Sequence, residues 1–255
     1  MAATRRQTSF VLTVSESKRL IAKGVAQCPA VLAALQNGIV AVAKGTTNGY
    51  IVEELTGETI HKPHYCTGTT RPHGGSGEAG IANKLPDLVL RDGKRWEGVA
   101  ATEAAAEMKA GDVFIKGANA VNYERRQAGI LIGHPTGGTI GAAIGSLVAR
   151  RATLLIPVGL EKNVPGDLKE AYRRLTAAGR DGSGPTLWPV DGEIFTELEA
   201  LEVLCGVEAV PIGAGGVLGA EGSVRIAVWG SRQQLEKVES LLGGIHGEPP
   251  FGAAG

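Results

Sequence analysis

The chain has 255 residues and a mass of 26.3 kDa, and its 26 lysines and arginines are balanced by 26 aspartates and glutamates. This neutrality excludes a protein that binds polyanions through overall positive charge, and a hydrophobic content of 43% excludes disorder throughout the chain. Glycine accounts for 38 residues, about twice its usual share, which places the excess in turns, helix ends and close approaches of the backbone to a ligand.

The first 55 residues alternate between predicted strands and helices. We expect strands over 10–14 and 39–43, and helices that start at Ser15, cover 29–35 and cover 50–55. The run 39–43 is continuously apolar and partly β-branched, which is typical of a strand buried on both faces. It ends in a glycine- and threonine-rich turn over 44–49. A buried strand followed by such a turn and a helix indicates an α/β protein.

The segment 56–86 is rich in Gly, Thr, Pro and His and has neither the helical nor the strand period. A loop of this length inside a compact domain is often a functional lid. It contains His61, His64, Cys66 and His73, which could bind a transition metal such as zinc. Their spacing matches no established metal motif, so we predict no metal and favour a polar active-site flap that uses the histidines. Solvated loop residues are the alternative.

Strands continue to alternate with helices up to about residue 160. We expect strands over 88–90, 112–116, 130–132 and 153–158, and helices over 100–110 and 139–151. Such alternation requires crossover helices between parallel strands. We therefore predict an α/β fold with a mainly parallel, Rossmann-like sheet and helices on both of its faces.

The pattern changes beyond residue 160. We expect helices over 167–178, 195–205 and 231–242, strands over 207–212 and 223–229, and a turn-rich break over 179–185. Strand, glycine-rich turn, strand and helix together indicate a smaller α+β portion. We accordingly divide the chain into an α/β ligand-binding domain, 1–160, and a smaller α+β portion, 161–255.

The cysteines and the apolar segments indicate the compartment. Cys28, Cys66 and Cys205 lie too far apart for a disulfide framework, which favours a reducing environment. The N-terminal apolar run is too short for a signal peptide, and no stretch approaches the roughly 18 apolar residues of a membrane span. We expect a cytoplasmic protein without a membrane partner.

Glycine-bearing turns after predicted strands are the strongest chemical signal. In an open α/β sheet, ligands bind beyond the carboxyl ends of the strands, where helix N-termini present free amides to anions. Three such turns would meet there, and the residues predicted to bind a small anionic metabolite are Lys44, Gly45, Thr46, Thr47, Asn48, Gly117, Asn119, Gly137, Gly138 and Thr139. Simple helix capping is the alternative. Neither a P-loop nor a dinucleotide fingerprint is present, and no cofactor is predicted.

Four motifs resemble the superfamily of ribose-5-phosphate isomerase A, glucosamine-6-phosphate deaminase and CoA transferases. They are 37–55 with its Gly45-Thr46-Thr47-Asn48-Gly49 turn, 112–119, the Gly137-Gly138-Thr139 turn, and 153–162, which ends in a lysine. The resemblance covers about residues 30–162. It implies the same fold and a turn at Thr46 that holds a substrate phosphate.

The sequence departs from that family where its catalysis occurs. Asn119 stands where the family has its catalytic aspartate, and Lys116 replaces the aspartate before the glycine. A glutamate-lysine pair expected after the glycine run is absent from 137–142, and no glutamate nucleophile matches that of the CoA transferases. The resemblance therefore implies a fold and an anion pocket, without the isomerase reaction, because an amide cannot accept a proton from a sugar carbon.

Two classes of function follow. As an enzyme, the protein would carry out isomerase- or transferase-type chemistry on a phosphorylated or acyl compound, with Lys116, His64 and His73 as candidate catalytic groups. Lys116 could act as a base or form a Schiff base, or it could be a solvated lysine at a strand end, as could Lys44. The alternative is a non-catalytic sensor or scaffold of the same fold. Aromatic residues at 4%, not interleaved with basic ones, argue against a nucleic-acid partner. Homo-oligomerisation is left open.

Overall fold

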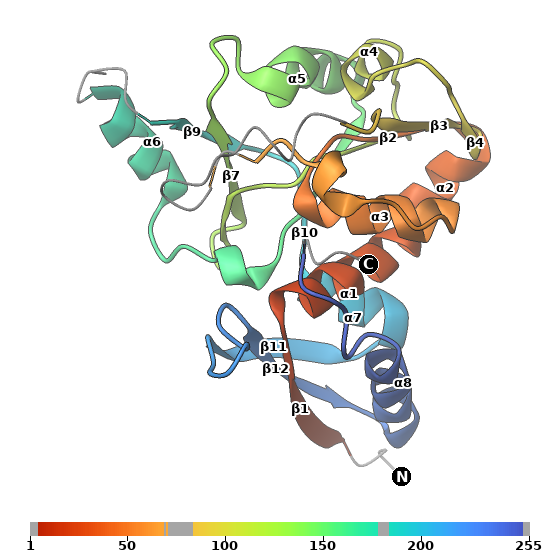
Figure 1. The fold of residues 1–255 in the computed structure, drawn as a ribbon, viewed down its shortest axis with the longest axis vertical. Helices are drawn as coiled ribbons and strands as arrows, with labels where there is room; N and C mark the ends of the chain where they lie inside the picture. Colours follow the sequence, from red (N-terminus) through yellow and green to blue (C-terminus); the bar gives the residue numbers. More distant parts are fainter. Residues whose placement is uncertain (1–4, 69, 71–83, 178–183, 252–255) are drawn as a thin grey trace.

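The protein is a mixed α/β fold built on three β-sheets (Figure 1). The computed structural model describes residues 5–68, 70, 84–177 and 184–251. The strands are β1 (Arg6–Leu12), β2 (Ile39–Val42), β3 (Leu88–Arg91), β4 (Lys94–Arg95), β5 (Val113–Ile115), β6 (Ala120–Asn122), β7 (Gln127–Ile132), β8 (Thr153–Pro157), β9 (Thr186–Val190), β10 (Glu193–Phe195), β11 (Glu208–Ala214) and β12 (Val224–Gly230).

Helices cover the sheets and connect their strands. They are α1 (Val14–Ala26), α2 (Pro29–Asn37), α3 (Thr46–Thr56), α4 (Ala101–Ala105), α5 (Gly138–Arg150), α6 (Leu168–Ala177), α7 (Glu197–Cys205) and α8 (Arg232–Gly243), with 3-10 turns η1 (Lys62–Tyr65) and η2 (Leu160–Lys162). None of the helices in the described part of the chain combines the length and the apolar character needed to cross a lipid bilayer.

The largest sheet has six strands in the order β10-β8-β5-β2-β3-β4. Its first four strands are parallel, and β3 and β4 pair antiparallel at one edge. Alternate residues of β2 face opposite sides: Val40 and Val42 pack in a core with α1, α2 and α3, whereas Ala41 packs in a second core with α4 and α5. The predicted α/β class, the mainly parallel sheet and the helices on both faces are therefore confirmed.

Parallel pairing brings the carboxyl ends of β2, β5 and β8 to one edge of this sheet. The register is tight, because Val42 lies opposite Ile115, and Ile115 lies opposite Leu155. The segments that follow these strands begin at residues 43, 116 and 158. This edge is where ligands bind in open α/β sheets.

The other two sheets are antiparallel. One has the order β1-β12-β11 and lies below α1 and α7 in Figure 1, and the other has the order β6-β7-β9. Strand pairing joins the two parts predicted on either side of residue 160. From the first part, β1 pairs with β12 along its whole length, beginning with Arg6 opposite Gly230. From the second part, β10 pairs with β8 and extends the main sheet. The division into 1–160 and 161–255 stays a prediction, because pairing alone does not define independently folding units.

Several predicted elements have different bounds in the structure. The strand expected over 10–14 begins at Arg6, because its residues pair with β12 outside the apolar run. The helix expected over 100–110 ends at Ala105, and the buried carboxylate of Asp112 then accepts the amide of Lys109 over 2.7 Å. The helix expected from Phe195 starts at Glu197, since Phe195 belongs to β10. Strands β4, β6, β9 and β10 were not predicted.

Candidate functional site

The first turn of α3 lies at the carboxyl ends of β2 and β5. The side-chain amide of Asn48 donates to the carbonyl oxygen of Ala43 over 2.7 Å and, more weakly, to that of Ile115 over 3.4 Å. The amide of Gly45 donates to the carbonyl of Tyr65 over 2.9 Å. These contacts join the helix start to two strands and to η1, so the turn is held rigidly.

The amides of the first turn of α3 are available to a ligand. The first hydrogen bond inside the helix runs from the amide of Gly49 to the carbonyl of Gly45, over 3.0 Å. The amides of residues 46–48 therefore have no acceptor within the helix, and no side chain caps it. The helix dipole adds partial positive charge at this end. Together these features form a site for an anion.

Two buried polar atoms in this turn lack partners. Thr47 is 3% exposed and Asn48 is fully buried, and neither Thr47 Oγ1 nor Asn48 Oδ1 has a hydrogen bond within the part of the chain that the structure describes. A buried polar atom left without a partner costs about 1–3 kcal/mol. Folded proteins tolerate such atoms where a ligand or water supplies the missing bond.

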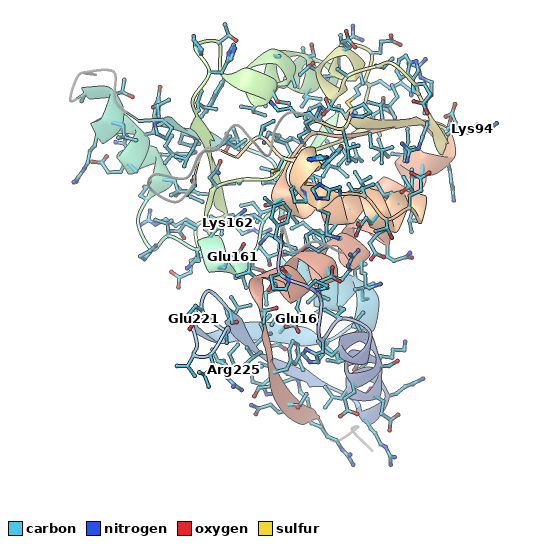
Figure 2. All side chains as sticks on the ribbon, in the orientation of Figure 1. Glu16, Lys94, Glu161, Lys162, Glu221 and Arg225 are labelled. Atoms are coloured by element: carbon cyan, nitrogen blue, oxygen red, sulfur yellow. The ribbon has the colours of Figure 1, made fainter. Side chains whose placement is uncertain are left out.

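Three lysines follow the strands that end at this edge. Lys44 Nζ forms an ion pair with Asp87 Oδ1 over 2.8 Å. Within the described residues, Lys116 Nζ has only a long contact of 3.4 Å with the carbonyl of Gly117, and Lys162 Nζ donates to the carbonyl of Ala118 over 3.1 Å. Figure 2 shows Lys162 on η2, next to Glu161. Lys116 and Lys162 are therefore the cations that could meet an anion here.

Burial, and then the positive charge of Lys162, lower the pKa of Lys116 from 10.5 to about 8, while Asp87 opposes the shift. Burial also lowers the pKa of Lys162, against the opposing effect of Glu161. Two ammonium groups at one site repel each other, so a bound anion would raise both pKa values. Near pH 8, Lys116 exists as a mixture of the charged ammonium and the neutral amine.

These groups line a cleft with two connected lobes. The narrow lobe has a volume of about 230 Å³ and is lined by residues 44–48, 67–68, 70, 116–119, 130–131 and 162. The wide lobe, of about 790 Å³, is lined by residues 67–68, 116, 130–134, 137–140 and 184–185. Both lobes share Lys116, and neither contains an aspartate or glutamate in its described lining.

The start of α5 forms one wall of the wide lobe. Gly137 precedes the helix with φ of 83°, and Gly138 begins it with φ of 59°, both in the left-handed region that favours glycine. A β-carbon at position 137 would also lie 2.9 Å from Trp188 Cζ3 and 3.0 Å from the Cα of Gly141. The turn that leads into α5 therefore requires glycine at these positions.

Asn119 supplies hydrogen-bond donors where a carboxylate would supply negative charge. Its side-chain oxygen Oδ1 accepts the backbone amide of Leu131 over 3.0 Å, and its backbone amide donates to the carbonyl of Gly129 over 2.8 Å. Because Leu131 uses the oxygen and no hydrogen bond of Nδ2 is described, the hydrogens on Nδ2 are the donors that this side chain can offer a ligand in the narrow lobe, which Asn119 lines. This wall suits an anion.

Most of the residues predicted from the sequence meet in this cleft. The narrow lobe contains Lys44, Gly45, Thr46, Thr47, Asn48, Gly117 and Asn119, and the wide lobe contains Gly137, Gly138 and Thr139. Lys116 lines both. Parallel pairing brings together the turns after β2 and β5, as expected. The turn at 137–139 follows β7, which pairs antiparallel with β6 and β9 in another sheet, so the expectation that a parallel strand would place it here was wrong.

Of the two histidines predicted as catalytic groups, the structure describes His64. His64 lies on η1 with its ring centroid 4.1 Å from that of His61, and it is not part of the described lining of either lobe. From the described part of the segment 56–86, Thr67, Gly68 and Thr70 line the narrow lobe. His73 lies outside the described residues. Among the residues that are described, no group of three or more His, Cys, Asp or Glu is placed to hold a metal ion.

Lys162 was not among the predicted site residues. The signal that could have identified it is the rule applied to Lys44 and Lys116, extended to the third parallel strand, 153–158. Ile130 and Leu131, which line both lobes, were also not predicted, because β7 belongs to a different sheet.

No family model, no curated protein and no solved structure matches this chain. The resemblance to the ribose-5-phosphate isomerase superfamily therefore stays a prediction. The case for a function depends on the geometry and the chemistry of the cleft.

Proposed function

We propose that the protein binds a small phosphorylated metabolite, with the phosphate in the narrow lobe against the first turn of α3. The observation that carries this proposal is the buried hydroxyl of Thr47, which has no partner within the described chain and lies beside free helix amides. A phosphate oxygen would accept from that hydroxyl and from the amides together. A water molecule could accept the hydrogen bond of the Thr47 hydroxyl, but a neutral water would not compensate the positive charge at the start of α3.

The charges support an anion over a neutral ligand. Lys116 and Lys162 lie at the narrow lobe without an aspartate or glutamate in its described lining. The cost of holding two buried cations falls when a dianion lies between them. A sulfonate, a sulfate ester or a carboxylate would meet some of the same donors, but a phosphate monoester offers three acceptor oxygens and nearly two negative charges.

The sizes of the lobes indicate where the rest of the ligand lies. The narrow lobe, at about 230 Å³, is smaller than the pockets of roughly 300–1,000 Å³ that enclose whole drug-sized ligands. It suits a phosphate and the few atoms next to it. The wide lobe, with Ile130, Leu131 and Ile132 in its wall, would take the remainder of the molecule.

We infer an enzyme of isomerase or transferase type, acting on a sugar-phosphate-like or acyl compound. Lys116 lies where the two lobes join, and so next to the atoms that follow the phosphate. We also propose that the chain is related to the ribose-5-phosphate isomerase superfamily. The kinship would cover the fold, with a Rossmann-like main sheet, and the anion pocket. The carboxylate chemistry of that family does not extend to Asn119.

The test is thermal stabilisation of the full chain by phosphate, pyrophosphate and ribose 5-phosphate. Binding to the folded state raises the melting temperature as ligand concentration rises. Thr47→Val keeps the shape of the side chain and removes its hydroxyl, so it should weaken binding by about tenfold or more, the value of a hydrogen bond to a charged group. Thr8→Val, on β1, is the matched control and should bind as the wild type does.

Two results would contradict the proposal. One is the absence of stabilisation by any of these anions up to millimolar concentration. The other is equal stabilisation of the wild type and the Thr47→Val protein, which would place the anion elsewhere on the molecule.

A further inference from the structure

Lys116 occupies the junction of the cleft. It follows β5, which lies between β8 and β2 in the main sheet, and its side chain lines both lobes. A ligand whose phosphate lies at α3 and whose body extends into the wide lobe must pass this side chain. The amine is therefore placed next to the first carbons beyond the phosphate.

Among the residues that the structure describes, the amine of Lys116 forms no ion pair with an acid. The carboxylate of Asp87 acts on the pKa of Lys116 through its charge. Asp87 is already bound by Lys44 Nζ over 2.8 Å and by the amide of Ala101 over 3.0 Å. The one hydrogen bond described for Lys116 Nζ is the 3.4 Å contact with the carbonyl of Gly117. Burial and the charge of Lys162 lower the pKa of Lys116 to about 8. A structural lysine is normally paired, whereas the described contacts of this one leave its amine without a strong partner.

Lys116 is the least engaged nucleophile of the described lining, because Lys44 pairs with Asp87, Lys162 donates to the carbonyl of Ala118, and the His134 ring contacts the hydroxyl of Thr136. The described lining contains hydroxyls, such as those of Thr46, Thr47 and Thr139, but no aspartate, glutamate or cysteine. A threonine hydroxyl needs a strong base before it attacks, whereas a lysine with a lowered pKa is partly neutral without one. The amine is thus the group best able to form a covalent bond with a ligand.

We propose that Lys116 forms a Schiff base with the carbonyl carbon of a phosphorylated aldehyde or ketone whose phosphate is held at the start of α3. This inference rests on the proposed function and narrows it to carbonyl compounds. Lys116 would be the catalytic residue, and the narrow lobe would position the carbonyl against it.

The step balances without a further reactant. The lone pair on Lys116 Nζ attacks the carbonyl carbon, and the carbon–oxygen π pair moves to the oxygen, which takes a proton from the Lys162 ammonium. The nitrogen then loses a proton back to Lys162, whose lowered pKa suits such an exchange. Loss of the hydroxyl with the second nitrogen proton releases water and leaves the carbon–nitrogen double bond. When protonated, this bond withdraws electrons from the adjacent carbon, which activates it for isomerisation or for carbon–carbon cleavage.

The experiment uses pyridoxal 5′-phosphate as a phosphorylated aldehyde probe on the full chain. Schiff-base formation is followed by absorbance, the bond is fixed with sodium borohydride, and the modified lysine is identified by peptide mass spectrometry. We expect Lys116 to be the main labelled residue. Pyridoxal without the phosphate should label it at least about tenfold less, because the charged hydrogen bonds at α3 are lost.

Variants and competition separate a site from general lysine reactivity. Lys116→Arg should abolish the absorbance change and the label, whereas Lys109→Arg, at an exposed side chain, should leave both unchanged. Inorganic phosphate should compete with the probe. Equal labelling by pyridoxal and its phosphate, or labelling spread over surface lysines, would overturn the proposal.

The failure of this inference can be told from the failure of the proposed function. If phosphate stabilises the wild type and loses affinity in Thr47→Val, while Lys116 is never labelled, the anion site stands and the Schiff base is wrong. If phosphate does not stabilise the protein at all, both proposals fail. Lys116→Arg keeps the positive charge, so its stabilisation by phosphate checks that the variant is folded.

Discussion

The side-chain amide of Asn48 donates to the carbonyl oxygen of Ala43 over 2.7 Å and so fixes the start of α3 at the carboxyl end of β2. Asn48 is fully buried, and its second contact, with the carbonyl of Ile115, reaches the neighbouring parallel strand. One residue of the helix thus holds together the two strand ends that form the narrow lobe.

Replacement of Asn48 should therefore cost both stability and ligand binding. Asn48→Ala leaves two buried carbonyl oxygens without this donor, and we expect the free energy of unfolding to fall by about 1–3 kcal/mol. Urea denaturation measures that change, and thermal shift with phosphate measures binding. Asn37→Ala, at an exposed position, should change stability by no more than about 0.5 kcal/mol. Equal stability of both variants would show that the Asn48 bonds are not needed.

Anion binding should weaken as Lys116 loses its proton. A dianion binds better to the ammonium form, so affinity for sulfate should be constant below about pH 7 and fall as pH rises through the pKa of about 8. Sulfate is the suitable probe because its own charge does not change in this range. Isothermal titration calorimetry at several pH values measures the effect, and one lost proton limits the fall to about tenfold per pH unit.

Two variants test the origin of that pH dependence. Lys116→Met should bind sulfate more weakly and show a flatter profile around pH 8, because the titrating group is gone. Lys162→Met removes the second ammonium, so the fall in affinity should move to higher pH as the pKa of Lys116 rises. If Lys162→Met shifts the fall to lower pH, or the profile of Lys116→Met matches the wild type, the assignment to Lys116 is wrong.

The sequence was sufficient to predict the parallel strands β2, β5 and β8 of the main sheet and the edge at which they end. The apolar run 39–43 and the glycine turn after it are local signals, and parallel pairing places such turns together whatever their distance along the chain. The same rule placed Lys44 and Lys116 correctly. Lys162 follows β8 in the same manner, and it was missed only because no glycine-rich turn leads into a long helix there.

Other features depend on contacts that no local pattern records. Strand β9 lies beside a turn-rich stretch, and it exists because it pairs with β7 from Gly129 opposite Pro189 to Ile132 opposite Thr186. The pairing of β1 with β12 joins the two ends of the chain and has no signature in either segment. His64 was assigned to the site from residue type alone, and the geometry of η1 turns it against His61.

Substitution of Asn119 by aspartate changes the charge inside the cleft with little change in shape. Asn119→Asp keeps the size of the side chain, and a carboxylate oxygen can still accept the amide of Leu131, which Asn119 Oδ1 accepts over 3.0 Å. It replaces two donors by a negative charge beside the proposed phosphate. We expect affinity for phosphate to fall by about tenfold or more, with little change in the melting temperature of the free protein.

A matched substitution away from the cleft controls for the added charge. Asn37→Asp adds the same charge at an exposed position and should leave phosphate binding unchanged. If Asn119→Asp binds phosphate as tightly as the wild type does, the anion does not lie in the narrow lobe. A measurable isomerase activity gained by Asn119→Asp would instead support the kinship with the superfamily whose aspartate stands at this position.

A buried acid lies behind the cleft, at the start of α7. Both carboxyl oxygens of Glu197 accept the amide of Leu160, over 3.0 and 3.2 Å, and the residue is fully buried. Glu161, labelled in Figure 2, forms an ion pair with Lys18 over 3.1 Å, and its second oxygen has no partner within the described residues. Burial, and then the charge of Glu161, raise the pKa of Glu197 above its usual value of 4.5.

This shift makes the protein less stable as pH rises. The folded state keeps the proton of Glu197 after the unfolded chain has lost it, so stability is greatest below pH 4.5 for this group and declines until Glu197 ionises in the folded state. Glu197→Gln cannot ionise, and its free energy of unfolding should therefore decline less between about pH 5 and pH 8, as measured by urea denaturation. Glu202→Gln, exposed on the same helix, should retain the decline of the wild type. An equal decline in Glu197→Gln and wild type would mean that Glu197 is already ionised in the folded protein, with Lys18 and Lys162 supplying the compensating charge.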